Sequence, residues 1–477
     1  MVKVNNFKKF FSLDLSLAKQ VVTISWPVVI GMLTQTMINI ADTVMVGMLD
    51  PKISVPGQAA LSLSLILLWA VGGFLSAVQV GTQALASRRM GANYTEKAGA
   101  ALTNSLFISI TTGLACAVAG AVLVDQFFPA VLSLMDKADP RVVELGIPYC
   151  RWRMINVFTM VVTISFKAFF DGIGKTYVHM TAALVMNILN LVLNWLLIFG
   201  VWIFPRMGVE GAGLASTIAS FIGLFIIFGW SGLPRYRKVF KYFRLSNLSL
   251  RIIGKIVRLS IPSGVATVIA MTGFYLLNLV VLELDHRAVS QGLVAVGETF
   301  NTAATKIVID ILSITFMSSI AFGMGTATLV GQSLGAKKPD LAENFGWQSV
   351  KIWSTFFGMI GIITLITPDT FTSLFTHSQG VIDAARDPLR MLASVEFLMA
   401  GALILAQCLF VAGLAKFVMF LELTLHFGVL VPGAFVFGLV LDWGIHGVFL
   451  AAVLYVVGLS TILGVKWHRG AWKKVDF

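Results

Sequence analysis

The sequence predicts an all-α membrane protein with twelve transmembrane helices in two six-helix bundles related by a pseudo-twofold axis. Hydrophobic residues make up 57% of the 477 residues and charged residues only 12%, and the mean hydropathy is +0.87. A soluble domain of this length would not tolerate such a composition. Long apolar stretches recur along the chain, and the second half repeats motifs of the first half in the same order.

Each apolar stretch holds roughly 20 residues, enough to cross about 30 Å of hydrocarbon. Because open strands would leave unsatisfied backbone groups in lipid, the stretches must be helices. The first six cover residues 24–49, 58–87, 102–124, 152–170, 177–200 and 209–230. The second six cover residues 261–282, 303–331, 347–367, 391–413, 417–441 and 446–466.

The internal repeat supports this count. The block at residues 81–92 (GTQALASRRMGA) returns at residues 325–336 (GTATLVGQSLGA). Ser-Trp-Pro at residues 25–27 opens the first stretch and Ser-Ile-Pro at residues 260–262 opens the seventh, and Gly208 and Gly211 are echoed by Gly444 and Gly447. A tandem duplication predicts an N-lobe (residues 1–231), a basic linker (232–258) and a C-lobe (259–477), with the pseudo-twofold axis along the membrane normal.

Basic residues predict the orientation. The linker carries eight Lys and Arg residues between Arg235 and Arg258 and no acidic residue, so the positive-inside rule places it in the cytoplasm. In a twelve-span count the N-terminal lysines, Arg88-Arg89, Lys337-Lys338 and the tail at residues 466–474 fall on the same side. We therefore expect a multi-pass protein of the plasma membrane, the inner membrane in a bacterium, with an uncleaved first helix and both termini in the cytoplasm.

Several function classes lack support in the sequence. The net charge of +12 sits in short loops, which favours anionic lipid headgroups over nucleic acid as the counter-charge. Cys116, Cys150 and Cys408 have no metal-ligand spacing. There is no phosphate-binding glycine loop, no metal-ligand cluster and no Ser/His/Asp arrangement. We expect no enzyme, no ATP-driven pump and no cofactor.

Several motifs resemble the multidrug and toxic compound extrusion (MATE) transporters. They are Asp42-Thr-Val-Met-Val-Gly47 preceded by Pro27, the block at residues 81–92 with its copy, and residues 190–194 (NLVLN) with 208–216 (GVEGAGLAS). The resemblance covers nearly the whole chain. It implies two six-helix bundles around a V-shaped cleft, and a monomer that exports amphiphilic, cationic small molecules by antiport with protons or sodium ions.

Asp42 is the strongest candidate for ion coupling. It lies midway along the first apolar stretch, and an ionisable side chain inside a span is costly and commonly functional. The alternative is an Asp that only fixes helix packing. The resemblance implies that Asn190, Asn194 and Ser216 of the fifth and sixth helices work with this acid, although the two asparagines could serve only in hydrogen bonding between helices.

The sequence favours protons over sodium ions. Sodium-coupled MATE relatives carry a Glu in helix seven, near Ala270 here, and an Asp in helix ten, near Gly401 here. Neither acid is present at these positions. A proton needs only one titratable group, so we expect proton coupling, with sodium as the open alternative.

Two further charged pairs belong to the C-lobe alone. Lys306 and Asp310 lie four residues apart in the eighth span, and Glu422 and His426 lie four apart in the eleventh, a spacing that puts both members on one helix face. Each pair is a candidate for substrate binding or proton relay. The structural alternative is a buried pair that only neutralises itself.

Other functions remain in competition. One is a flippase for a lipid-linked precursor, which would carry additional spans and a cationic central cavity. A second is a dedicated exporter of one endogenous metabolite. An ion channel would more naturally show rings of identical residues in a symmetric oligomer, whereas this chain supplies two unlike lobes.

Overall fold

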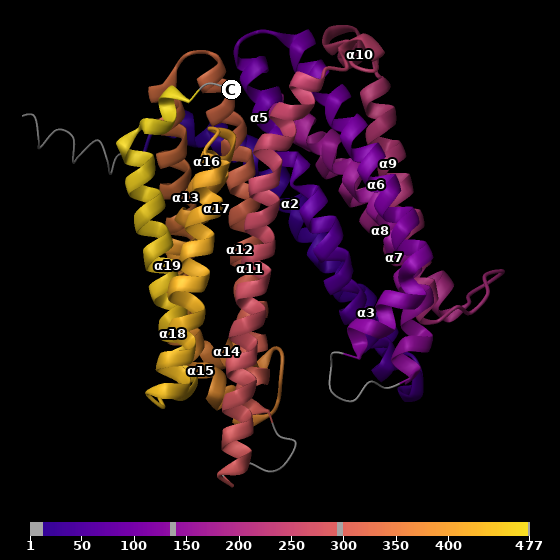
Figure 1. Ribbon diagram of the computed structural model, residues 1–477, viewed down its shortest axis with the longest axis vertical. Helices are drawn as coiled ribbons and strands as arrows, with labels where there is room; N and C mark the ends of the chain where they lie inside the picture. The colour runs from indigo at the N-terminus through magenta and orange to yellow at the C-terminus, as the bar shows by residue number, and fades with distance from the viewer. Residues whose placement is uncertain (1–12, 134–139, 293–298, 476–477) are drawn as a thin grey trace, which may run out of the picture. The chain divides into compact units, whose positions relative to one another are not determined.

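The computed structural model describes residues 13–133, 140–292 and 299–475, and these residues form helices joined by short turns, with no strand among them (Figure 1). Eleven helices in these ranges are long and apolar enough to cross a membrane. The number rises to twelve if the pair α15 (Gln379–Ala393) and α16 (Glu396–Val411), bent by 55°, counts as one span. This bent pair replaces the single helix predicted at residues 391–413.

The helices are longer than the apolar stretches because polar turns extend their ends. Those of the first half are α2 (Leu15–Gly47), α3 (Pro51–Leu68), α4 (Phe74–Ser76), α5 (Val78–Gly91), α6 (Thr95–Leu132), α7 (Pro140–Gly172), α8 (Tyr177–Phe199), α9 (Val209–Gly232) and α10 (Pro234–Phe240). A π-helical turn, Trp69–Gly73, joins α3 to α4, so that Pro51–Gly91 makes one span.

The second half follows the same plan. Its helices are α11 (Leu250–Ser290), α12 (Phe300–Gly335), α13 (Pro339–Ile366), α14 (Pro368–Ser373), α15, α16, α17 (Ala415–Leu425), α18 (Val431–Phe435) and α19 (Gly444–Arg469). Gly208 lies directly before α9 and the corresponding Gly444 is the first residue of α19, and both glycines have a φ of +58°. Glycine adopts this backbone conformation without steric cost.

Contacts divide the chain into two compact units whose boundaries differ from those of the predicted lobes. One unit holds the described residues of Met1–Val29 and Val265–Phe477, and the other holds Ile30–Gly264. We call the first the 265–477 unit and the second the 30–264 unit. The helices α2 and α11 each change unit two residues after a proline, Pro27 and Pro262 respectively.

The repeated motifs explain this exchange. In the 265–477 unit, Ser25 donates a hydrogen bond to the carbonyl oxygen of Phe322 at 3.1 Å and packs on Gly325. In the 30–264 unit, Gly81 faces Ile256 and Ser260, and a Cβ atom on Gly81 would lie 2.5 Å from the Ile256 carbonyl oxygen. The serine of each half therefore packs against the repeated glycine of the other half.

The threonines that follow Gly81 and Gly325 make corresponding contacts in the two units. Thr82 on α5 bonds to Ser105 on α6 at 2.6 Å, and Thr326 on α12 bonds to Ser349 on α13 at 2.8 Å. Each hydroxyl pair is buried and hydrogen-bonded, as buried polar groups must be. The duplicated block thus encodes close helix packing in both units.

The basic segment predicted as a linker is a folded part of the 30–264 unit. The rings of Tyr236, Phe240 and Tyr242 are buried against Phe169 and Phe170 of α7, and each buried side chain of this size stabilises the fold by about 1.5–3 kcal/mol. Lys241 forms an ion pair with Glu96 at the start of α6. The segment therefore lies at the same end of this unit as the loop after Arg88-Arg89, as the charge pattern predicts.

Polar contacts bring three chain segments to one end of the 265–477 unit. Lys473 lies 2.7 Å from Asp340 and 2.6 Å from Glu343, at the start of α13. The amide of Asp14 donates to Gln348 of the same helix at 3.2 Å. The tail thus contacts the start of α13, next to the loop after Lys337-Lys338, and the residue before α2 contacts the same helix further along. The N-terminal lysines fall outside the described residues.

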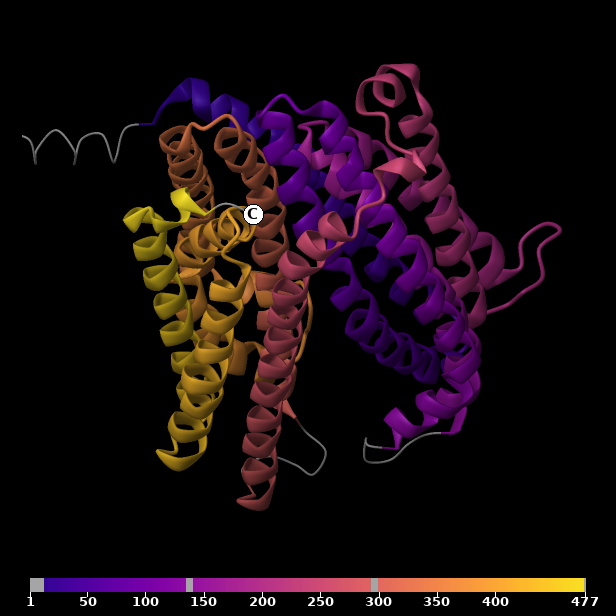
Figure 2. The ribbon, with the colours of Figure 1, turned by 45° about the horizontal axis from the view of Figure 1, so that its top comes forward.

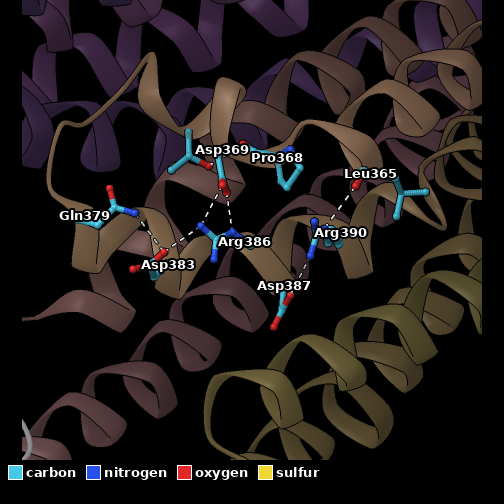
Figure 3. Close-up of polar contacts among 9 residues, drawn as sticks. Leu365, Pro368, Asp369, Gln379, Asp383, Arg386, Asp387 and Arg390 are labelled. Atoms are coloured by element: carbon cyan, nitrogen blue, oxygen red, sulfur yellow. Dashed lines mark hydrogen bonds and ion pairs between the residues drawn. The ribbon is translucent and has the colours of Figure 1, made fainter.

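The opposite end of this unit holds an ion-pair network on α14 and α15 (Figure 3). Arg386 makes a bidentate contact to Asp369 at 2.8 and 2.9 Å and also reaches Asp383 at 2.9 Å. These hydrogen bonds from Arg386 hold the pKa of the Asp369 carboxyl below its usual range. A third of the Arg386 side chain and half of the Asp369 side chain are exposed, so water screens this ion pair.

The glycine contacts generate a prediction. Gly81→Ala and Gly325→Ala should each destabilise the protein by about 1–3 kcal/mol, because the added methyl group would overpack a filled contact. The unfolding midpoint of the purified protein in detergent measures this. The control is Gly229→Ala in α9, where a Cβ atom would meet nothing within 4 Å. Midpoints unchanged from the native protein for both Gly81 and Gly325 variants would contradict the packing role of the repeat.

Candidate functional site

Asp42 lies in the middle of α2, within the 30–264 unit, and its side chain is almost completely buried. Asn194 of α8 donates to its Oδ1 atom at 2.5 Å, and the Ser216 hydroxyl of α9 donates to its Oδ2 atom at 3.2 Å. Both carboxylate oxygens therefore have a donor. A buried carboxylate without such partners would be strongly destabilising.

The four residues predicted for ion coupling form one hydrogen-bonded ring. Asn190 and Asn194 lie one turn apart on α8, and Asn194 donates to the side-chain oxygen of Asn190 at 3.2 Å. Asn190 in turn donates to the Ser216 hydroxyl at 3.1 Å. The structure thus brings together Asp42, Asn190, Asn194 and Ser216, while their role in ion coupling stays a prediction.

Two residues of α7 belong to this site and were missed from the sequence. Arg153 is buried and its charge acts on the Asp42 carboxylate. Its guanidinium group lies 6.0 Å from the ring centroid of the buried Tyr149. Arg153 falls at the start of the fourth apolar stretch, and an arginine inside a span is the signal that could have identified it.

A small cavity opens beside the carboxyl group of Asp42. Its volume is about 40 Å³, and it is lined by Asn39, Asp42, Thr43, Leu61, Ser62, Leu65 and Tyr149. A polar cavity of this volume is large enough for a water molecule.

A larger hollow in the same unit lies away from this chemistry. Its volume is about 650 Å³, and charged side chains of both signs line it together with two apolar ones: Asp50, Lys52, Ile53, Arg141, Glu144, Leu145 and Arg206. None of the predicted site residues lines it. We take Asp42 as the candidate centre because its carboxylate is buried and both of its oxygens accept hydrogen bonds. The larger volume of the other hollow does not by itself indicate a functional site.

The pair Lys306–Asp310 is formed, but it is not buried. The Lys306 Nζ atom lies 2.8 Å from Asp310 Oδ2 on α12, and the two side chains are 76% and 42% exposed. The pair is therefore not buried within the packed side chains of the 265–477 unit, and its role stays a prediction.

The pair Glu422–His426 is formed and buried in the 265–477 unit. His426 Nδ1 lies 3.2 Å from Glu422 Oε2, and the exposed fractions of the two side chains are 0% and 13%. Tyr455 of α19 donates to the same Glu422 oxygen at 2.8 Å. The sequence predicted the pairing but not the tyrosine, which lies 33 residues further along the chain.

Three other buried charged residues, Glu396 and the pair Lys167 and Asp171, were missed from the sequence. Glu396 begins α16, and its carboxylate accepts a hydrogen bond from Thr315 of α12. It lies five residues before Gly401, where the MATE resemblance placed an absent acid. On α7, Lys167 and Asp171 form a buried ion pair at 3.1 Å. All three residues lie in or beside predicted spans, where the rarity of ionisable residues is the available signal.

Comparison with known proteins identifies the family. The MatE family model matches residues 27–196 and 262–436, which correspond to one segment in each half of the chain. The chain belongs to the MATE family. It is therefore a multi-pass membrane transporter and not an enzyme.

Relatives of this MATE transporter match over nearly its whole length. The probable multidrug resistance protein NorM of Thermotoga maritima is 22% identical and covers 96% of this chain and 93% of its own. The multidrug resistance protein PmpM of Pseudomonas aeruginosa is 22% identical, and the match covers 95% of this chain and 91% of PmpM. The multidrug resistance protein NorM of Vibrio vulnificus is 24% identical, and the match covers 94% of this chain and 95% of that NorM.

Solved structures show the same fold. An outward-facing multidrug resistance MATE transporter of the MOP superfamily matches with a TM-score of 0.84 at 21% identity, covering 96% of this chain and 97% of its own. A MOP superfamily transporter from Pyrococcus furiosus matches with a TM-score of 0.83 at 20% identity, with the same coverage. The predicted all-α MATE fold is confirmed.

The exposure of Lys306 and Asp310 leads to a prediction. A double-mutant cycle of Lys306→Gln and Asp310→Asn should show a coupling of at most about 0.5 kcal/mol, because we expect exposed charges within a span to face water and not lipid. Unfolding of the single and double variants in detergent measures it. A coupling of several kcal/mol would show instead that the pair experiences a low dielectric in the folded protein.

Proposed function

We propose that this MATE transporter is a secondary antiporter that exports amphiphilic, cationic small molecules in exchange for protons by alternating access. The hydrogen-bonded ring around Asp42 is the observation that carries the proposal. A single titratable group lies at its centre, and neutral amide and hydroxyl groups surround it. The names of the relatives, which refer to multidrug resistance, support small-molecule drugs as substrates.

The ring can accommodate both protonation states of Asp42. When the carboxyl is ionised, Asn194 and Ser216 donate to its two oxygens. When it is protonated, it becomes a donor, and the Ser216 hydroxyl can rotate to accept from it. Asp42 would take up a proton in the outward-facing state and release it in the inward-facing state.

The donors around the carboxylate favour a proton over a sodium ion. Hard cations are held by several oxygen atoms, whereas an amide N–H group and a hydroxyl group face the Asp42 oxygens.

The alternatives are a flippase for a lipid-linked precursor and an exporter of one endogenous metabolite. The multidrug resistance names of the relatives favour drug export over both. We further propose that the protein is a monomer in the plasma membrane, where it contacts membrane lipids.

Orientation is part of the proposal, with both termini and the basic segment at residues 232–258 in the cytoplasm. The opposite orientation would translocate eight basic residues in one short loop. A cysteine at Ser246, in a variant that lacks the three native cysteines, should therefore not react with an impermeant thiol reagent in intact cells. Reaction before the cells are lysed would contradict this orientation.

The central prediction concerns Asp42→Asn. This variant should fold and bind substrate, because asparagine keeps the shape of the side chain, but it should not couple export to a proton gradient. Gradient-driven transport of a fluorescent cationic dye by purified protein in liposomes should fall to the level of protein-free liposomes.

The matched control is Asp125→Asn, which makes the same chemical change at an exposed acid of the same unit. Its transport should remain at the native level. Full proton-driven transport by Asp42→Asn would move the coupling site elsewhere in the chain.

A further inference from the structure

A second buried titratable cluster lies in the 265–477 unit and is separate from the Asp42 ring. Glu422 belongs to α17, His426 begins the π-helical turn His426–Leu430, and Tyr455 belongs to α19. Figures 1 and 2 show α19 running beside the α17–α18 span in both views, and the contacts between these elements agree. The three side chains therefore meet inside one packed unit.

The contacts of His426 determine which ring nitrogen carries hydrogen. Its Nδ1 atom lies 3.0 Å from the carbonyl oxygen of Glu422 and 3.2 Å from the Oε2 atom of the Glu422 carboxylate. Both neighbours are acceptors, so Nδ1 is the protonated nitrogen of the neutral ring. The lone pair, and with it the basic site, is then on Nε2.

The Nε2 atom of His426 is buried and makes no hydrogen bond to any described residue. No described donor occupies its lone pair, so the nitrogen can accept a proton. A bound proton would turn Nε2 into an imidazolium N–H, and the resulting positive charge would face the Glu422 carboxylate through Nδ1. The unpartnered lone pair is the position where such a proton would bind.

The His426 ring is closely packed on several sides. A Cβ atom on Gly273 of α11 would clash with the His426 ring. Tyr455 packs edge-to-face on the ring with the centroids 4.6 Å apart, and Phe274 of α11 does so at 6.1 Å. Single π-helical turns inside α-helices occur frequently at functional sites.

The contact between Glu422 and His426 compensates charge in two protonation states of the cluster. With a proton on Nε2, imidazolium and carboxylate give a net charge of zero. Without it, the single negative charge on Glu422 is still stabilised by the Tyr455 hydroxyl at 2.8 Å and by the Nδ1–H group. Among the described residues, Glu422 and Tyr455 are the titratable groups recorded in contact with the ring, and α11 faces it with Gly273 and Phe274.

We infer that Glu422 and His426 form a second proton-binding site, in which His426 Nε2 takes the proton and Glu422 stabilises the charge. The inference rests on the proposed proton antiport and adds to it that each cycle moves one more proton than Asp42 alone would carry. Tyr455 is a positioning residue that holds the Glu422 carboxylate.

Nitrogen NMR tests the site without transport. The chain contains six histidines, so protein labelled with ¹⁵N-histidine gives few signals, and His426→Gln identifies the signal of His426. We expect the Nδ1–H tautomer at high pH and a doubly protonated ring at low pH. Glu422→Gln should weaken proton binding at His426 about tenfold or more, because the stabilising charge is removed.

Several NMR results would overturn the inference. One is a His426 ring that keeps one protonation state at every pH at which the protein stays folded. Another is an identical titration in native protein and in Glu422→Gln, which would mean that the cluster only supports the π-helical turn. A third is displacement of the bound proton by sodium chloride but not by choline chloride, which would assign the site to sodium.

Transport stoichiometry tests the role of the site. The number of protons moved per dye molecule in liposomes should fall by one in both His426→Gln and Glu422→Gln. If His426→Gln does not fold, Glu422→Gln alone provides the test. The control His446→Gln changes an exposed histidine of the same unit and should keep the native ratio. Native ratios in both cluster variants would contradict a transported proton at this site.

The two proposals fail in different ways. If the native protein shows no proton-driven transport, the proposed function fails, whereas the NMR titration still reports whether His426 binds a proton. If transport is proton-driven with the native ratio in both cluster variants, antiport stands and the second site fails.

Discussion

The burial of one carboxylate in an apolar helix bundle is the constraint that organises the candidate site. A charge taken out of water must be compensated where it lies. Asp42 obtains this compensation from Asn194 and Ser216, which Asn190 joins in a closed ring. The ring requires α2, α8 and α9 to pack at one level, so the polar groups that we propose to take part in proton exchange also fix the packing of these helices.

A buried charge is also compensated by neighbouring groups in the 265–477 unit, although the side chains differ. There a carboxylate, an imidazole and a phenol compensate one another on α17, the π-helical turn and α19. The chain connects the two units through continuous helices, since α2 and α11 each begin in one unit and continue into the other. Each unit thus contains its own buried titratable centre and a helix start from the opposite half of the sequence.

The sequence predicted the helices, the duplication and the buried acid Asp42, because apolar length, repeated motifs and a lone ionisable residue in a span are local signals. The partners Asn190, Asn194 and Ser216 came from the MATE resemblance. It did not predict which unit residues 15–29 and 250–264 join, because that depends on packing between distant segments, such as Ser25 on Gly325. Arg153 and Tyr455 were missed because their importance comes from neighbours on other helices. The exposure of Lys306 was unpredictable for the same reason: spacing determines the pairing, whereas tertiary packing determines the burial.

The most direct test of the account is the number of protons released when substrate binds to purified protein in weakly buffered detergent solution. If substrate binding and protonation of Asp42 exclude one another, the native protein releases protons on addition of a cationic dye, and a pH-sensitive indicator counts them. The account predicts that Asp42→Asn binds the dye but releases fewer protons than the native protein. Equal release by Asp42→Asn at equal dye binding would contradict it.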